Sequence, residues 1–237
     1  MTRTAIVTGG SGAVGAAIVR VLVRDGWRVA FTWNTHEKPA ISLAEETGAF
    51  AIRADLTVRA QADEMARLAL ERLEHVDALI NNAGFTQVMP FAMIDEEDWD
   101  AVLAGCLKTM FLATHSLARN MIHRKQGVIV NIGSLAGHRM LEVPVHYATA
   151  KAGVTGFTLS LAKELSRYGI RVNEVVPGLL TQGVGTMVPE AELAEYVRYC
   201  AAGRPGRPEE VAETAAFLAS ERAGYINGQS VFVDGGI

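Results

Sequence analysis

Cysteine and positive charge are both scarce in this sequence, and each shortage excludes a class of site. Cys106 and Cys200 are the only cysteines among 237 residues, and neither lies in a CxxC motif or near a pair of histidines. A disulfide framework and a metal site are therefore not indicated, and a reducing cytosol is the expected compartment. With a formal net charge of -4, the chain lacks the generally basic surface that nucleic acid requires.

Targeting segments and long hydrophobic runs are also missing. The first residues, MTRTAIVTGG, lead directly into a predicted strand and leave no room for a signal peptide. No apolar run approaches the ~18 residues that a membrane span needs. We therefore expect a cytoplasmic protein without a membrane span. A composition of 49% hydrophobic and 20% charged residues is typical of one globular domain, here residues 1–237.

Strand and helix patterns alternate along the chain. Strands are expected at 4–8, 28–33, 49–54, 78–81, 127–132, 170–176 and 230–233, and helices at 13–25, 38–47, 59–73, 96–123, 147–168 and 208–220. This alternation predicts a single Rossmann-type α/β fold, a doubly wound parallel sheet of about seven strands with helices on both faces. Residues 179–205 follow the sixth strand, where ligands bind in such sheets, and are a candidate substrate lid.

A glycine-rich turn, TGGSGAVG at 8–15, joins the first predicted strand to the first predicted helix. Glycines in this context let the backbone approach a pyrophosphate at a helix N-terminus, although a tight turn in any α/β protein would look similar. Asp55 follows the third strand and could accept a hydrogen bond from an adenine amino group or cap the next helix. With NNAG at 81–84 ending the fourth strand, these segments outline one dinucleotide groove.

The end of the second predicted strand bears on the choice of cofactor. The chain reads TWNTHEK there, so that Asn34, Thr35 and His36 form the tip, where sites that prefer NAD usually place a carboxylate. Its absence favours the 2′-phosphate of NADPH over NADH. Lys38 is close to this tip but could equally be a solvated residue at the start of a helix.

Tyr147 and Lys151 lie four residues apart in HYATAKAG, on one face of a predicted helix. A neighbouring ammonium stabilises a phenolate, so Tyr147 can act as a general acid toward a carbonyl oxygen. Ser134 ends the fifth predicted strand and could donate a hydrogen bond to the same carbonyl. Each feature alone has an ordinary explanation, because YxxxK arises by chance in helices and serine is common in turns.

Taken together and in order, these motifs resemble the short-chain dehydrogenase/reductase superfamily over the whole chain. The resemblance rests on TGGSGAVG, ADLT, NNAG, Ser134 with YATAK, VVPG at 175–178 and the terminal GQSVFVDGG. Within the superfamily the chain is most similar to the β-ketoacyl-acyl carrier protein reductases. That similarity implies NADPH-dependent reduction of a 3-oxoacyl thioester, bound to acyl carrier protein, in fatty acid or specialised polyketide-like synthesis.

The resemblance also implies roles for individual residues. Ser134 would orient the carbonyl, Tyr147 would donate the proton, and Lys151 would stabilise the phenolate while holding the nicotinamide ribose. The cofactor would be contacted by Tyr147, Lys151, Gly9, Ser11, Gly12, Val14, Gly15, Asn34, Thr35, Asp55, Leu56, Asn82, Ala83, Gly84, Pro177, Gly178 and Val184.

The chain departs from the family pattern at three places. Cys106 occupies the position where relatives commonly have an Asn, in a helix irregularity whose backbone carbonyl holds a water beside the catalytic lysine. We expect altered proton delivery there rather than a thiol nucleophile, because a buried thiol with no cation nearby in sequence forms little thiolate. Gly12 replaces a usual basic residue. His146, before the tyrosine, is expected to be a packing contact.

Partners and alternative functions complete the expectations. Arg124, Lys125 and Arg167 could form a basic edge near the entrance for acyl carrier protein, or be ordinary solvated helix ends. Arg139 and the apolar loop around it are expected to face the acyl chain, and the resemblance implies a homotetramer. Two other functions stay open: a dehydrogenase of a free small alcohol or sugar, and a cofactor-binding subunit with weakened catalysis.

Overall fold

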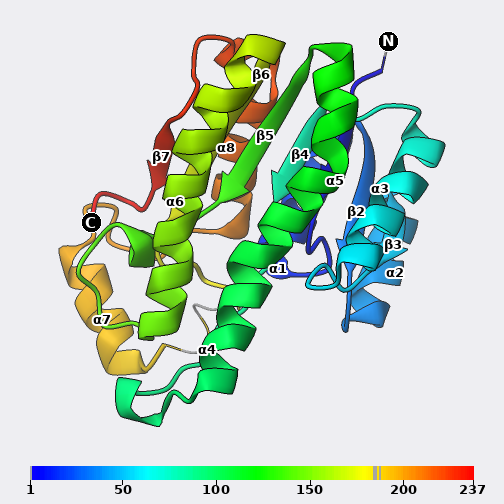
Figure 1. Cartoon of the computed structure of the whole chain (residues 1–237). Coiled ribbons are helices and arrows are strands. Elements are labelled where there is room, and N and C mark those ends of the chain that lie inside the picture. Colours follow the sequence, from blue (N-terminus) through cyan, green and yellow to red (C-terminus); the bar gives the residue numbers. More distant parts are fainter. Residues whose placement is uncertain (1, 184–185, 187) are drawn as a thin grey trace.

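The centre of the molecule is a sheet of seven parallel strands, in the order β3-β2-β1-β4-β5-β6-β7 (Figure 1). The computed structural model describes residues 2–183, 186 and 188–237. The strands are β1 (Thr4–Val7), β2 (Arg28–Trp33), β3 (Phe50–Arg53), β4 (Ala78–Asn81), β5 (Gly127–Ile132), β6 (Ile170–Pro177) and β7 (Ser230–Val233). This topology confirms the predicted fold class, a doubly wound parallel sheet of seven strands.

Helices cover both faces of this sheet (Figure 1). They are α1 (Ala13–Arg24), α2 (Glu37–Thr47), α3 (Arg59–Leu73), α4 (Glu96–Leu103), α5 (Thr109–Arg124), α6 (Val145–Leu165), α7 (Glu190–Tyr199) and α8 (Pro208–Ala219). One core cluster joins α1, α2 and α8 to the sheet, and the other joins α3, α5 and α6 to its opposite face. Along β1, Ala5 and Val7 enter the first cluster and Ile6 the second, which explains why the strand is apolar throughout.

The first strand is also where the strand order reverses, because β1 pairs with β2 on one side and with β4 on the other. In doubly wound sheets this reversal opens a crevice beyond the carboxyl ends of the strands. The end of the sheet at which the strands finish is hereafter the carboxyl end, and the end at which they begin is the amino end. The switch point thus predicts a ligand site at the carboxyl end, between β1 and β4.

One helix departs from regular α geometry. Helices α4 and α5 are joined without a break by a single π-helical turn, Ala104–Lys108. The joined helix, Glu96–Arg124, is long and apolar enough by length and composition to cross a membrane, contrary to the expectation from the sequence. Half of its most apolar window is buried in the structure, and α5 packs on α3 and on β4 and β5. It is therefore placed as a core helix.

Candidate active site

The turn between β1 and α1 is fixed against the end of β4. The amide of Asn82 donates to the carbonyl oxygens of Thr8 (3.0 Å) and Gly9 (3.1 Å), and the Gly9 N–H donates to Thr32 Oγ1 (3.0 Å). Gly9 has φ +65°, and a Cβ there would lie 2.9 Å from the Ala83 Cα. Only glycine combines this backbone angle with this close approach, so the turn has the tight geometry expected of a phosphate loop.

The N-terminus of α1 opens directly behind this turn. Gly12 is the N-cap, no side chain caps the helix, and its first turn carries no acidic residue. The first N–H groups of such a helix point outward and attract an anion. The residues present therefore fit the pyrophosphate of a dinucleotide.

A cleft of about 1140 Å³ runs along the carboxyl end of the sheet from this turn to Tyr147. Every residue assigned to cofactor contact from the sequence lines it, except Val184, which lies outside the described residues. At the end of β2 its wall consists of Trp33, Asn34, Thr35 and His36, and in this described stretch no carboxylate lines it. The fold thus brings together residues from six separate segments of the sequence.

Asp55 lines the cleft and also makes local hydrogen bonds in the turn after β3. Its Oδ1 accepts hydrogen bonds from the Thr57 N–H (2.9 Å) and the Thr57 hydroxyl (2.7 Å). These bonds close the turn that leads into α3, whose N-cap is Val58. The alternative that Asp55 caps α3 itself is therefore wrong, although its carboxylate does hold the preceding turn.

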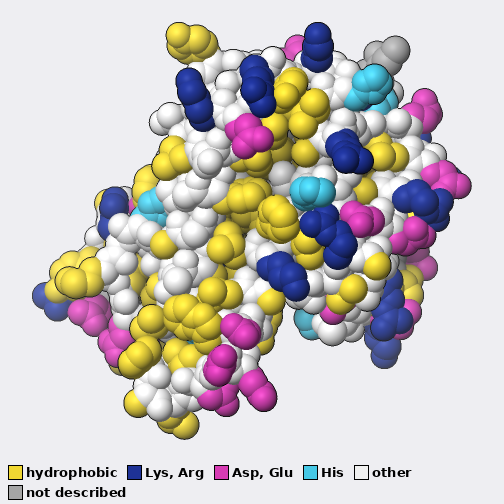
Figure 2. All heavy atoms as spheres, in the orientation of Figure 1, with side chains coloured by type: hydrophobic (Ala, Val, Ile, Leu, Met, Phe, Trp, Pro, Cys, Tyr) yellow, Lys and Arg dark blue, Asp and Glu magenta, His cyan; other side chains and the backbone are white. Residues whose placement is uncertain are grey.

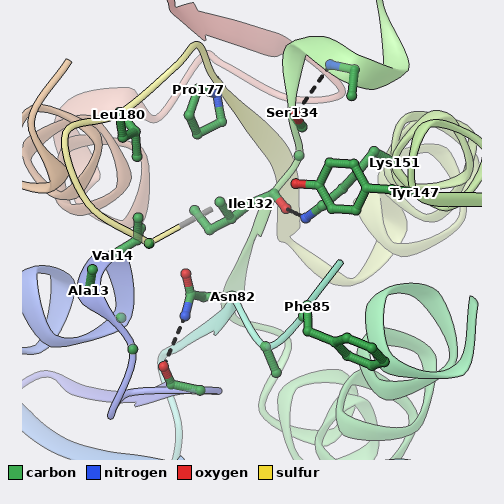
Figure 3. Close-up of a pocket in the computed structure, with 18 of the residues that line it drawn as sticks. Ala13, Val14, Asn82, Phe85, Ile132, Ser134, Tyr147, Lys151, Pro177 and Leu180 are labelled. Carbon is green, nitrogen blue, oxygen red and sulfur yellow. Dashed lines mark hydrogen bonds between the residues drawn. The ribbon is translucent and has the colours of Figure 1, made fainter. Parts of the chain in front are cut away.

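Ser134, Tyr147 and Lys151 meet on one wall of the cleft (Figure 3). Lys151 is only 6% exposed; its ammonium donates to the Ile132 carbonyl oxygen (2.9 Å) and lies 5.7 Å from the centre of the Tyr147 ring. The Tyr147 hydroxyl points into the cleft in Figure 3. Ser134 starts a short 3₁₀ turn, Leu135–Gly137, and its Oγ accepts from the Ala136 N–H (3.2 Å). The geometry brings a phenol, an ammonium and a hydroxyl to one place.

The π turn lies beside these residues and contains Cys106. The Cys106 side chain is buried and its thiol donates to the Phe85 carbonyl oxygen (3.0 Å). In a π turn the carbonyls lose their usual partners four residues on, and the Gly105 carbonyl instead accepts from the Thr109 hydroxyl (2.8 Å). The helix irregularity expected at this position is thus present with cysteine in place of asparagine.

Phe85, Gly105 and Thr109 also line the cleft and were not singled out from the sequence. The only signal for Phe85 was its position directly after NNAG. No sequence signal pointed to Gly105 or Thr109, because a π turn has no sequence pattern comparable with that of a helix cap.

The loop before α6 forms the substrate side of the cleft. Met140, Leu141, Glu142 and Val143 line it. Arg139 does not, because its guanidinium stacks on Phe232, 5.1 Å from the ring centre. The expectation that Arg139 faces the acyl chain is therefore wrong. His146 is fully buried and its Nδ1 accepts from the Tyr147 N–H (2.9 Å), which is the local contact expected of it.

Helix α7 also lines the cleft. Glu192, Glu195, Tyr196 and Tyr199 line the cleft from this helix. The Tyr196 hydroxyl donates to the Asp234 carbonyl oxygen (3.1 Å) and accepts from the Leu179 N–H (3.1 Å). Burial raises the pKa of Tyr196, so this hydroxyl keeps its proton at neutral pH.

The three basic residues expected near the entrance lie at the other end of the sheet. Arg124 donates to the Val76 carbonyl oxygen (3.0 Å) and pairs with Asp77 (2.7 Å), directly before β4. Lys125 lies against Gly169, directly before β6, and Arg167 precedes it in the same connection. Figure 2 shows Lys and Arg side chains gathered where α5 and α6 end, away from the cleft. A basic edge at the entrance is therefore a wrong expectation for these residues.

Known proteins resemble this chain over its full length. The family model described as enoyl-(acyl carrier protein) reductase matches residues 10–237. An acetoacetyl-CoA reductase from Rhizobium meliloti is 38% identical, with 100% of this chain and 98% of the relative covered. A 3-oxoacyl-[acyl-carrier-protein] reductase FabG from Chlamydia pneumoniae is 33% identical, with 99% and 96% covered.

Solved structures agree in fold. A Serratia marcescens short-chain dehydrogenase/reductase variant superposes with a TM-score of 0.91 at 32% identity, covering 99% of this chain and 97% of its own. A Brucella melitensis protein described as ribose-5-phosphate isomerase gives 0.92 at 32% identity, covering 99% and 92%. The resemblance drawn from the sequence motifs is confirmed: this chain belongs to the short-chain dehydrogenase/reductase family of oxidoreductases, which use a nicotinamide cofactor.

Proposed function

We propose that this protein reduces the ketone of a 3-oxoacyl thioester to the 3-hydroxyacyl thioester with NADPH, in the cytoplasm. The observation that carries the proposal is the meeting of Ser134, Tyr147 and Lys151 on one wall of a cleft that continues from the glycine turn. Beyond them the loop before α6 contributes three apolar residues, Met140, Leu141 and Val143, to the lining of the cleft. Apolar walls suit an acyl chain more than a sugar.

The mechanism assigns one task to each polar group. The Ser134 hydroxyl donates a hydrogen bond to the substrate carbonyl oxygen and orients it. Tyr147 donates its proton to that oxygen as reduction proceeds, and the Lys151 ammonium stabilises the phenolate that remains. Because the Ile132 carbonyl holds the ammonium (2.9 Å), its position is set before substrate arrives. When bound, the reduced nicotinamide supplies a hydride to the carbonyl carbon.

The glycine turn and the N-terminus of α1 would hold the pyrophosphate, and Asn82, Lys151 and the segment from Pro177 would hold the nicotinamide side. NADPH is preferred over NADH because no carboxylate lines the described wall at the end of β2. A cation also lies nearby: the Arg53 guanidinium lies 5.4 Å from the centre of the Trp33 ring. Positive charge without a competing carboxylate favours a 2′-phosphate.

The acyl group is proposed to be carried on acyl carrier protein, as in the relatives named 3-oxoacyl-[acyl-carrier-protein] reductase. Coenzyme A is the second candidate, because the 38% identical relative is an acetoacetyl-CoA reductase. We further propose that residues 179–205, with α7, form a lid that closes over the acyl group. The hydrogen bond from the Leu179 N–H to the Tyr196 hydroxyl supports this, because it ties α7 to the start of the segment.

Assembly into a homotetramer is also proposed. Phe111 on α5, Leu159 on α6 and Phe232 on β7 are 45%, 54% and 39% exposed, and Figure 2 shows hydrophobic side chains over α5 and α6. Exposed large apolar side chains mark an interaction surface where they form a contiguous patch. Light scattering should give about four times the 25.4 kDa chain mass; a 25.4 kDa particle would contradict the tetramer.

An NADPH oxidation assay tests the proposed reaction. Acetoacetyl groups on acyl carrier protein, on coenzyme A and on N-acetylcysteamine are each offered with NADPH or NADH. We expect oxidation of NADPH, fastest with the carrier protein. Failure with all three thioesters together with turnover of a free alcohol or sugar would support the dehydrogenase alternative. Cofactor binding without any turnover would support the binding subunit.

A further inference from the structure

Glu174 is a fully buried carboxylate that the proposed mechanism does not use. It lies in the middle of β6, where it is paired in register with Asn131 of β5 and Ser230 of β7, and its side chain is 0% exposed. A carboxylate without water around it is destabilising unless hydrogen-bond donors surround it. The hydrogen-bond donors around the Glu174 carboxylate therefore show which segments it connects.

Three donors from three elements converge on this carboxylate. The Ser230 hydroxyl donates to Oε2 (2.6 Å), as does the Thr155 hydroxyl (3.1 Å). The His138 Nε2 lies 3.4 Å from Oε1 and 3.0 Å from the Thr155 Oγ1. With its proton on Nε2, the imidazole has a single N–H at this nitrogen, which is shared between the nearer Thr155 Oγ1 and Glu174 Oε1. Phe232 packs edge-on against the same ring, with centroids 5.1 Å apart.

The cluster lies directly behind two catalytic elements. His138 ends the 3₁₀ turn that Ser134 begins, and it is followed by the loop that lines the substrate side of the cleft. Thr155 lies one helical turn beyond Lys151 on α6. Gly133, which precedes Ser134, packs so closely on Glu174 that a Cβ would overlap its Oε1. The carboxylate thus touches the serine turn on one side and the helix of Tyr147 and Lys151 on the other.

We propose that Glu174 and His138 are positioning residues for this site. Glu174 anchors His138, and His138 in turn fixes the distance between Ser134 and the helix that carries Tyr147. The pair also sets the starting point of the loop from Arg139 to Pro144, so it holds the wall against which the substrate lies. This role rests on the proposed reduction at Ser134 and Tyr147, whereas the anchoring of the turn can be measured without any substrate.

The test replaces each partner of the carboxylate in turn. His138→Ala removes the anchor, and His138→Gln restores a donor near the position of Nε2. Ser230→Ala is the matched control, because Ser230 contacts the same carboxylate from β7 without touching the serine turn. Glu174→Gln keeps the shape of the side chain but removes its charge, and serves as a second variant if His138→Ala folds poorly.

Hydrogen exchange on the free enzyme is the first measurement. Amides in residues 134–143 should exchange about tenfold faster in His138→Ala and Glu174→Gln than in the parent, and less than about twofold faster in Ser230→Ala. Steady-state rates are the second: kcat should fall roughly tenfold in His138→Ala with unchanged cofactor affinity, and recover to within about threefold in His138→Gln.

The outcomes separate the positioning role from the proposed reaction. If exchange accelerates but no thioester is reduced even by the parent, the anchoring stands and the proposed function fails. If exchange in residues 134–143 is the same in His138→Ala as in the parent, the positioning role is overturned. It is equally overturned if Ser230→Ala has the same effect as His138→Ala, or if only the melting temperature changes.

Discussion

The two ends of the parallel sheet use polar side chains in opposite ways. At the amino end, Asp77 accepts hydrogen bonds from the Thr4 N–H (2.9 Å) and from Arg124 (2.7 Å), and His75 lies 3.2 Å from it. At the carboxyl end, Ser134, Tyr147 and Lys151 line a cleft. The polar groups around Asp77 at the amino end bond to one another, whereas Ser134, Tyr147 and Lys151 at the carboxyl end line an open cleft. In the proposed function, the first end therefore stabilises the fold and the second carries the chemistry.

The electrostatics of Asp77 show what the amino end contributes. Burial alone would raise the pKa of Asp77, but hydrogen bonds from Arg124 and the Thr4 N–H, with the charge of His75, outweigh burial and lower it. A carboxylate whose pKa is lowered by folding stabilises the native state above its unfolded pKa of about 3.9. That contribution is lost as the pH falls through the lower pKa of the folded state.

The largest effect is expected at the carboxyl end. Tyr147→Phe removes the proton donor, so kcat should fall by about 10²–10⁴-fold, while the melting temperature and cofactor affinity stay near those of the parent. Thioester reduction, nicotinamide fluorescence and thermal melting measure the three quantities. Tyr168→Phe, which makes the same change near the amino end, is the control. Parental turnover in Tyr147→Phe would refute the assignment of the acid.

Arg124→Met tests whether the amino end contributes to stability and not to turnover. Loss of two hydrogen bonds from a charged group should lower the free energy of unfolding by about 1.5–3 kcal/mol at pH 7, with kcat unchanged. Because one of the groups that lower the pKa of Asp77 is then gone, the loss of stability between pH 7 and pH 3 should be smaller than in the parent. Urea unfolding at both pH values measures this, with Arg167→Met as the surface control.

A fall in kcat in Arg124→Met without any loss of stability would contradict the division between the two ends of the sheet. It would also reopen the role of the basic residues in substrate capture, which their position before β4 and β6 argues against.

Gly9→Ala probes the cofactor part of the cleft. Forcing a Cβ into φ +65° costs about 1–2 kcal/mol, and the new methyl group would push the turn away from Ala83. Cofactor affinity should fall about tenfold in a fluorescence titration. Gly26→Ala is the matched control, because Gly26 has φ +81° but nothing lies within 4 Å of the added Cβ. Equal affinities in the two variants would mean that the turn does not hold the cofactor.

The carboxyl end could be predicted from the sequence wherever local geometry dictates residue type. The glycine turn needs a positive φ at Gly9, and the Tyr147 and Lys151 pair needs only the helical repeat, so both were found at residue level. The prediction that Arg124, Lys125 and Arg167 lie near the entrance was wrong, although the topology of the predicted fold already determines their position. A helix that connects parallel strands runs back to the amino end, so its last residues cannot lie at the entrance.

Other features depend on contacts between distant segments and leave no local pattern. Glu174 and His138 are 36 residues apart, and nothing in either segment announces the other. The same holds for Arg139, whose stacking on Phe232 is set by the position of β7. Such contacts form only when the strands assemble into the sheet. Composition and periodicity predict the sheet but not which individual side chains meet across it.

The smallest effect is expected at Cys106. The π turn already exists around the thiol, and an asparagine amide could make the same donation to the Phe85 carbonyl. The space is limited, because a Cβ on Gly84 would lie 3.3 Å from the sulfur. Cys106→Asn should therefore match or exceed the parental kcat by no more than about threefold, measured with Cys106→Ala as the control that removes the donor. A large fall in kcat in Cys106→Asn would show that the packing of the π turn depends on the sulfur atom. The thiol would then be required for the geometry of the site, and asparagine could not replace it.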